Sequence, residues 1–197
     1  MIPESAFNQI LGDVNGVSIE EMITLFNIAV QYQLKANEVY IRDGESSKKL
    51  AFIEKGIIRT YAVKDNGDEA TLLLRWEGQF IASHDTIILG QPSRFVYRAL
   101  ENTSIFEIDY DVLENILHQN TKYERLRIYF LMKMLGEALQ LAESFILFTP
   151  EERYLNLMKE KYDIVNRVPD KYLASLLGIT PVSLSRIRKR ILLKQKN

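Results

Sequence analysis

Residues 180–190, near the C-terminal end, combine small, hydroxylated and basic side chains at helical spacing. Thr180 is a preferred N-cap residue and Pro181 a preferred first helical residue, so a helix is predicted to begin at Pro181. Side chains of this kind can approach phosphates and base edges in the major groove of DNA, and Arg186 is the expected base reader. The predicted DNA contacts are Lys171, Thr180, Pro181, Val182, Ser183, Ser185, Arg186, Lys189 and Arg190.

A helix-turn-helix over residues 170–191 is predicted to position these side chains. Gly178 can adopt the positive φ that ends a first helix, and Ala174 is small where two helices cross. The apolar residues that should face each other across the crossing are Leu173, Leu177, Ile179, Leu184 and Ile187. The alternative is an ordinary helical hairpin with a solvated basic tail, which requires several independent signals to coincide by chance.

Charge is distributed unevenly along the chain. Residues 170–197 contain seven Lys or Arg and one Asp and carry a net charge of +6, which leaves −7 on the remainder of a chain whose total is −1. A small module with a concentrated positive field is what binding to a nucleic-acid backbone requires. Double-stranded DNA is therefore the predicted partner.

Composition argues against most enzyme classes. The chain has no cysteine, and its only histidines are His84 and His118, so thiolate sites, iron–sulfur clusters and most metal centres are excluded. No metal, cofactor or catalytic residue is expected, and the protein is predicted not to be an enzyme. The sequence has neither a secretory signal pattern nor an apolar run long enough to span a bilayer, so a cytoplasmic location is expected.

The fold class predicted from periodicity is α+β. Between residues 30 and 108, short β-branched and aromatic segments alternate with glycine turns, which is typical of a β-sandwich or jelly roll. Asn66-Gly67 is the clearest hairpin turn. Strands are predicted at Gln31–Leu34, Val39–Ile41, Leu50–Glu54, Ile57–Val63, Ala70–Arg75, Arg94–Leu100 and Thr103–Ile108.

Helical periodicity flanks this β-region. One short helix is predicted after a capping box at Ser18–Glu21, another at Val112–Leu117, and a long one over about 121–148. The long helix has heptad-like apolar positions and further apolar residues off that stripe, so it needs two neighbours. We predict that one is the same helix of a second subunit in a homodimer; a long core helix of a monomer is the alternative.

A second capping box, Thr149-Pro-Glu-Glu152, marks the predicted domain boundary. Residues 1–148 should form the β-domain with its dimerisation helix, and residues 149–197 the helix-turn-helix domain.

This order of elements resembles the Crp/Fnr family of bacterial transcription regulators across essentially the whole chain. In that family a double-stranded β-helix, or jelly roll, of the cyclic-nucleotide-binding type precedes a dimer helix and a C-terminal helix-turn-helix. The resemblance rests on Gly44, Gly56, Gly78-Gln-Phe-Ile81, Arg98-Ala99, Leu173-Ala174, Gly178-Ile179, Leu184 and Ser185-Arg186-Ile187. It implies that Arg186 binds a base edge.

Departures from the family pattern concern the ligand. Where cAMP-binding members carry Gly-Glu-Leu, whose glutamate accepts from the ribose hydroxyl, this chain has Ala82-Ser83-His84, and their phosphate-binding Arg-Ser is replaced by Ser93-Arg94. A one-residue shift turns a side chain to the opposite face of an extended segment, and a buried phosphate without a cation is costly. We therefore predict that cAMP binds weakly or not at all.

The remaining polar residues of this region are Ser83, His84, Ser93, Arg94 and Tyr97. They form either a pocket for an unidentified anionic small-molecule effector or a filled vestige of one. Haem would depend on His84 alone, which as a loop histidine is more commonly a half-exposed residue without a ligand.

The family's β-hairpin wing after the recognition helix is truncated, because only residues 192–197 follow. The predicted function is a sequence-specific DNA-binding transcription regulator that is not cAMP-responsive. The alternatives are a cupin-like small-molecule enzyme, which would need a metal cluster that two histidines cannot supply, and a cyclic-nucleotide-binding module with a helical appendage.

Overall fold

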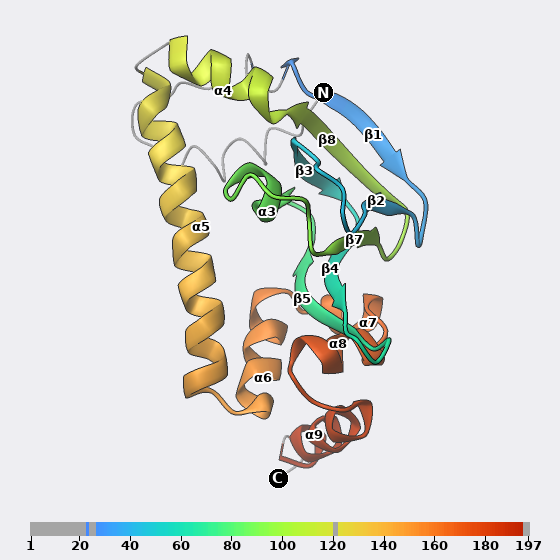
Figure 1. Cartoon of the computed structure of the whole chain (residues 1–197). Helices are drawn as coiled ribbons and strands as arrows, with labels where there is room; N and C mark the ends of the chain where they lie inside the picture. Colours follow the sequence, from blue (N-terminus) through green and yellow to red (C-terminus); the bar gives the residue numbers. More distant parts are fainter. Residues whose placement is uncertain (1–22, 24–26, 120–121, 195–197) are drawn as a thin grey trace.

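The computed structural model describes residue 23 and residues 27–119 and 122–194. The capping box predicted at Ser18–Glu21 and the last three residues of the chain lie outside this range. Two antiparallel sheets form the first half of the molecule (Figure 1), with strand orders β1-β8-β3-β6 and β2-β7-β4-β5. Their strands are β1 Val30–Leu34, β2 Val39–Ile41, β3 Lys49–Lys55, β4 Ile58–Val63, β5 Glu69–Arg75, β6 Phe80–Ala82, β7 Val96–Ala99 and β8 Thr103–Asp109.

The core of this β-domain lies between the two sheets. Core residues alternate along strands such as β3, which contributes Ala51 and Ile53, and β7, which contributes Tyr97 and Ala99. The buried apolar residues come from both sheets: Leu34, Ile41, Ala51, Ile53, Ile58, Ile81, Tyr97, Ala99 and Ile105. The predicted α+β class and jelly-roll architecture are confirmed.

Most predicted strands are confirmed, with two differences. The three-residue strand β6 was not among the predicted segments. Strand β7 begins at Val96 rather than at Arg94, so Arg94 lies in the loop that precedes the strand. The hairpin at Asn66-Gly67 is present, since Val63 pairs with Glu69 and Gly67 has φ +85°.

The helices extend along and beyond the β-domain. They are α3 His84–Ile87, α4 Tyr110–Gln119, α5 Lys122–Leu147, α6 Pro150–Glu160, α7 Ile164–Arg167, α8 Asp170–Leu176 and α9 Pro181–Lys194. Helix α5 runs along one side of the molecule, and α6 to α9 gather below the β-domain (Figure 1). The capping box at Thr149 is present, with reciprocal hydrogen bonds to Glu152, and only two residues separate the end of α5 from the start of α6. Within the described part of the chain, none of the helices has the length and apolar character needed to cross a membrane.

Candidate nucleic-acid interface and effector pocket

Helices α8 and α9 form the predicted helix-turn-helix, and its turn has the predicted geometry. Gly178 has φ +69°, and the N–H of Ile179 next to it donates to the carbonyl of Ala174 at 2.9 Å, which closes the end of α8. The Oγ1 of Thr180 accepts from the N–H of Ser183 at 3.2 Å, so Thr180 caps α9. Local sequence signals therefore fix where the second helix begins and in which direction it leaves the turn.

The two helices cross on the apolar residues that the sequence indicated. Leu173, Ala174 and Leu184 are fully buried. Leu177 and Ile187 are also buried, and Ile179 packs against the same cluster while partly exposed. The opposite side of α9 is thereby directed to solvent.

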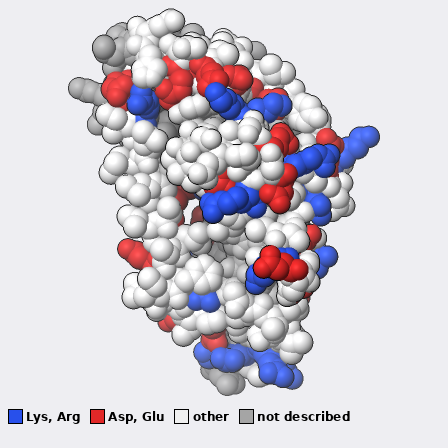
Figure 2. Space-filling view, in the orientation of Figure 1, with Lys and Arg blue, Asp and Glu red and all other residues white. Residues whose placement is uncertain are grey.

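The outward side of α9 carries the predicted DNA contacts. Arg186 and Lys189 are exposed, and neither has an ion-pair partner among the described residues. Figure 2 shows Lys and Arg side chains gathered at the end of the molecule that α9 forms. Also exposed are Thr180, Pro181, Val182, Ser185 and Arg190, while Ser183 is half-buried. A small, hydroxylated surface flanked by unpaired cations is thus available to a ligand.

Two cations near the C-terminal end of α9 are engaged by an acidic residue. Arg190 and Lys194 each contact the carboxylate of Glu151 at 2.8 Å. Hydrogen bonding from Lys194, together with the charge of Arg190, holds the pKa of Glu151 below its usual value. Because Glu151 offsets its charge, Arg190 should attract an anionic ligand less strongly than Arg186 or Lys189, although its side chain is exposed.

Lys171 lies at the start of α8 and is exposed. Its Nζ lies 4.7 Å from the centre of the Tyr172 ring. The ring face attracts the ammonium group of Lys171, which the sequence predicts to contact DNA.

In the candidate effector pocket, Arg94 is hydrogen-bonded to the carboxylate of Asp85. Asp85, the second residue of α3, is fully buried. Its carboxylate accepts from the backbone N–H of Arg94 at 2.9 Å and from Nη2 of the same residue at 2.8 Å. These hydrogen bonds outweigh burial and hold the pKa of Asp85 below its usual value. The one cation that the sequence offered for an anionic effector is therefore bound to the protein's own anion.

The other polar residues of the pocket also have partners within the chain. The hydroxyl of Ser83 pairs with that of Thr86 at 3.1 Å, and the hydroxyl of Ser93 donates to the carbonyl of Phe95 at 2.8 Å. Both serines are buried, and burial raises the pKa of Tyr97 to about 12, so its phenol stays neutral.

The ring of His84 is half-exposed and lies beside Phe95, with 5.3 Å between ring centres, and its Nε2 is 3.4 Å from Asp85. The structure brings all five predicted pocket residues together around α3. Asp85 is the residue that the sequence interpretation missed, since nine residues separate it from Arg94 and no motif links the two.

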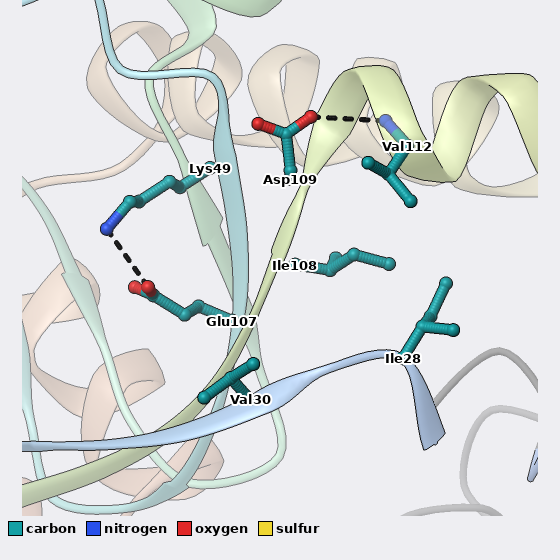
Figure 3. A pocket seen from close by; sticks show the side chains of 7 residues that line it. All are labelled: Ile28, Val30, Lys49, Glu107, Ile108, Asp109 and Val112. Carbon is teal, nitrogen blue, oxygen red and sulfur yellow. Dashed lines mark hydrogen bonds and ion pairs between the residues drawn. The ribbon is translucent and has the colours of Figure 1, made fainter.

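Two surface cavities lie elsewhere. The first, of about 250 Å³, is lined by the side chains drawn in Figure 3, and the Lys49–Glu107 ion pair lies at one side of it. The second, of about 310 Å³, lies between α6, α7 and α9 and includes Tyr162 and Leu192. Neither contains a residue of the predicted effector pocket. Among the residues that the structure describes, no group of three His, Asp or Glu is placed to hold a metal ion.

Helix α5 presents a long apolar surface to solvent. Phe130 packs edge-to-face on Phe80 of the β-domain, with 5.2 Å between ring centres, so one side of the helix is covered. The heptad-like positions lie exposed: Ile128 at 51%, Leu131 at 46%, Leu135 at 52%, Leu139 at 55% and Ile146 at 79%. Monomeric proteins rarely expose so long an apolar stripe.

Known proteins share both the sequence pattern of the β-domain and the fold of this chain. Residues 31–120 match the family model of the cyclic nucleotide-binding domain. FixK2 from Bradyrhizobium japonicum has a similar structure, with a TM-score of 0.74 and 16% identity over 85% of this chain and 86% of that one. The c-di-GMP-responsive global regulator CLP of Xanthomonas campestris gives a TM-score of 0.65 at 16% identity, over 90% and 93% of the two chains.

The catabolite activator protein of Thermus thermophilus gives a TM-score of 0.54 at 15% identity, over 92% of this chain and 86% of that one. No curated protein is significantly similar in sequence. These neighbours share the fold of this chain, so the predicted resemblance to the Crp/Fnr family is confirmed at the level of the fold.

Proposed function

We propose that this protein is a sequence-specific DNA-binding transcription regulator of the Crp/Fnr type, that it acts as a homodimer, and that it is not an enzyme. The observation that carries the proposal is the outward side of α9, where Arg186 and Lys189 are exposed and unpaired among the described residues. They extend from a helix whose N-terminal half is small and hydroxylated, so that it can approach base edges closely. The fold shared with regulators supports the same reading.

DNA binding is tested by selecting bound fragments from random duplex DNA and measuring affinities by fluorescence anisotropy. Arg186→Ala should weaken binding by about 1–3 kcal/mol and relax the preference at one base pair. Lys189→Ala should weaken binding to all sequences alike and lower the salt slope by about one. The matched control is Lys159→Ala, which removes an exposed cation of α6 outside the predicted interface. Unchanged selectivity in Arg186→Ala would exclude it as the base reader.

Dimerisation through α5 follows from its exposed stripe. Two copies of this stripe can bury each other, and a two-fold axis would place two recognition helices at half-sites one helical turn apart, about 34 Å. Leu135→Glu should dissociate the dimer in sedimentation velocity and abolish binding to two-half-site DNA. Gln140→Glu, which adds the same charge to an exposed position off the stripe, should leave the dimer intact. A wild-type protein that is monomeric and binds no oligonucleotide at low ionic strength would refute the proposed function.

We further propose that the regulator does not respond to cAMP, because the carboxylate of Asp85 already provides Arg94 with its anion. A cyclic phosphate would have to displace a buried carboxylate that would then have no cation, which costs several kcal/mol. The candidate effector pocket is on this account a closed vestige. Calorimetry with cAMP should show no binding at micromolar concentrations, and low-micromolar affinity would contradict the closed-pocket account while leaving DNA binding untouched.

A further inference from the structure

The helix-turn-helix and the β-domain share one hydrophobic core. Trp76, which follows β5, is buried together with Leu173 and Leu184 of the two DNA-binding helices. The cluster draws on both halves of the chain: Ile57, Leu74, Trp76, Tyr154, Ile164, Val168, Leu173, Ala174, Leu177, Leu184, Ile187 and Ile191. Here strands of the β-domain complete the core of the helices.

Helix α8 also hydrogen-bonds to the edge of a sheet. Strand β5 is the outermost strand of its sheet, so part of its backbone lacks a strand partner. The N–H of Thr71 donates to Oγ of Ser175 at 2.9 Å, and that hydroxyl donates to the carbonyl of Glu69 at 3.2 Å. One side chain of α8 thus pairs with two backbone groups of β5 and fixes the helix along the strand.

A buried arginine holds the same contact together. Arg59 of β4 is fully buried, and its guanidinium lies 4.2 Å from the centre of the Tyr61 ring and 3.8 Å from that of Tyr172 in α8. Its Nε donates to Oγ1 of Thr71 at 2.8 Å, and it forms an ion pair with Glu69. One guanidinium nitrogen, Nη2, has no hydrogen-bond partner among the described residues. Loss of a contact to a buried charge costs free energy, because water cannot replace it. The contact between the guanidinium of Arg59 and the ring of Tyr172 therefore favours the position in which α8 packs against the sheet.

A second arginine joins α7 to two loops of the β-domain. Arg167 contacts Glu77, between β5 and β6, at 2.5 Å, and it also forms an ion pair with Glu101, between β7 and β8. Glu77 in turn accepts from the N–H of Gly56 at 2.9 Å and contacts Lys161 at 3.2 Å. Because these partners come from separate loops, Arg167 restrains α7, which leads directly into α8.

We propose that Arg59, Tyr172, Ser175 and Arg167 are positioning residues, which hold the helix-turn-helix against the β-domain so that α9 is presented to DNA in one direction relative to α5. The inference rests on the proposed function. The contacts of Tyr172 and Ser175 lie on the side of α8 that faces β4 and β5, and those of Arg167 lie on α7. Lys171 and the outward side of α9 stay exposed. Docking therefore leaves the DNA-binding surface free, and no bound effector is needed to order it.

The proposal is tested on the full-length protein with two readouts. Trp76 is the only tryptophan, and it is 9% exposed within the shared core, so its quenching by acrylamide measures separation of the two parts. The second readout is the affinity for duplexes that carry two selected half-sites, measured as the separation of the half-sites is changed by single base pairs. The dependence of affinity on separation shows how rigidly the two recognition helices are held relative to each other. Tyr172→Leu and Ser175→Ala disturb the contact without placing a new charge in the core. The matched control is Tyr32→Leu, which alters a half-exposed tyrosine of β1.

We expect both variants to raise the quenching of Trp76 at unchanged far-ultraviolet circular dichroism. Their affinity at the preferred half-site separation should fall about tenfold, since a loosely held helix must be ordered on binding, whereas their affinity for a single half-site should not change. Tyr32→Leu should match the wild type in both readouts. If the variants keep the wild-type separation profile, or if quenching of Trp76 stays at its wild-type value, the positioning role is refuted. A wild-type protein that binds no duplex would refute the proposed function instead, a result that cannot be confused with these.

Discussion

Replacing Gly178 by alanine should destabilise the protein through a contact with helix α5 as well as through the backbone. The residue has φ +69°, which an L side chain adopts at a penalty of about 1 kcal/mol. A Cβ at this position would lie 3.2 Å from Cε1 of Phe145, near the end of α5. Because Phe145 is 48% exposed, its ring can shift by a few tenths of an ångström, so the contact should add only about 1 kcal/mol. We expect a loss of about 2 kcal/mol in total.

Gly90→Ala is the matched control for this change. Gly90 has φ +65°, nearly the same backbone conformation, but a Cβ there would meet no atom within 4 Å. Its substitution should therefore cost about 1 kcal/mol, the backbone contribution alone. Urea denaturation of both variants gives the difference. Equal destabilisation would show that the turn of the helix-turn-helix does not pack on Phe145, and that α5 and α9 are not joined at this point.

Three further changes test the same architecture. Burial alone would raise the pKa of Glu77, but hydrogen bonds from Arg167 and other donors lower it from its ordinary 4.5 to about 2. The contribution of Glu77 to the free energy of unfolding should therefore be complete above pH 4.5 and should be lost as the pH falls from there towards 2. Glu77→Gln should flatten this dependence in acid titrations of folding. Leu184→Ala, at a fully buried position, should lose about 2–5 kcal/mol in thermal melts, whereas Leu192→Ala, at a 59% exposed one, should stay within about 0.5 kcal/mol. Thr149→Ala should lose about 1 kcal/mol in urea, because it removes the capping box that begins α6.

Local structure could be predicted from the sequence because its causes are local. The N-cap at Thr180, the glycine at 178, the capping box at Thr149 and the hairpin at Asn66-Gly67 each depend on residues within a few positions of one another. All four are present in the structure. The extent of α5 was also predictable, since its apolar positions repeat over the whole helix.

Contacts between distant segments could not be predicted in the same way. Arg59 reads in the sequence as an ordinary charged residue of a strand, yet it is fully buried beneath Tyr172, which lies more than a hundred positions later in the chain. The pairing of Asp85 with Arg94 likewise depends on how α3 folds back on the loop before β7. Periodicity and turn signals carry no information about such pairs. The predicted boundary at residue 149 lies at the turn between helices α5 and α6, and the shared hydrophobic core contains residues from both sides of it.

Two arginines lead to one physical argument: Arg94, which the sequence assigns to the candidate effector pocket, and Arg59, to which it assigns no role. The side chain of Arg94 is largely exposed, but it forms an ion pair with Asp85. The candidate effector pocket therefore already contains the anion that an anionic effector would provide. Arg59 is buried and joins the β-domain to α8, so the helix-turn-helix is already held in place. A ligand shifts a conformational equilibrium only by its difference in affinity for the two states. Arg94 of the predicted effector pocket is not free for an anionic ligand, and the DNA-binding helices are held by internal contacts. Our proposals together therefore predict that DNA affinity will depend on salt and dimer concentration and will be the same with or without cAMP.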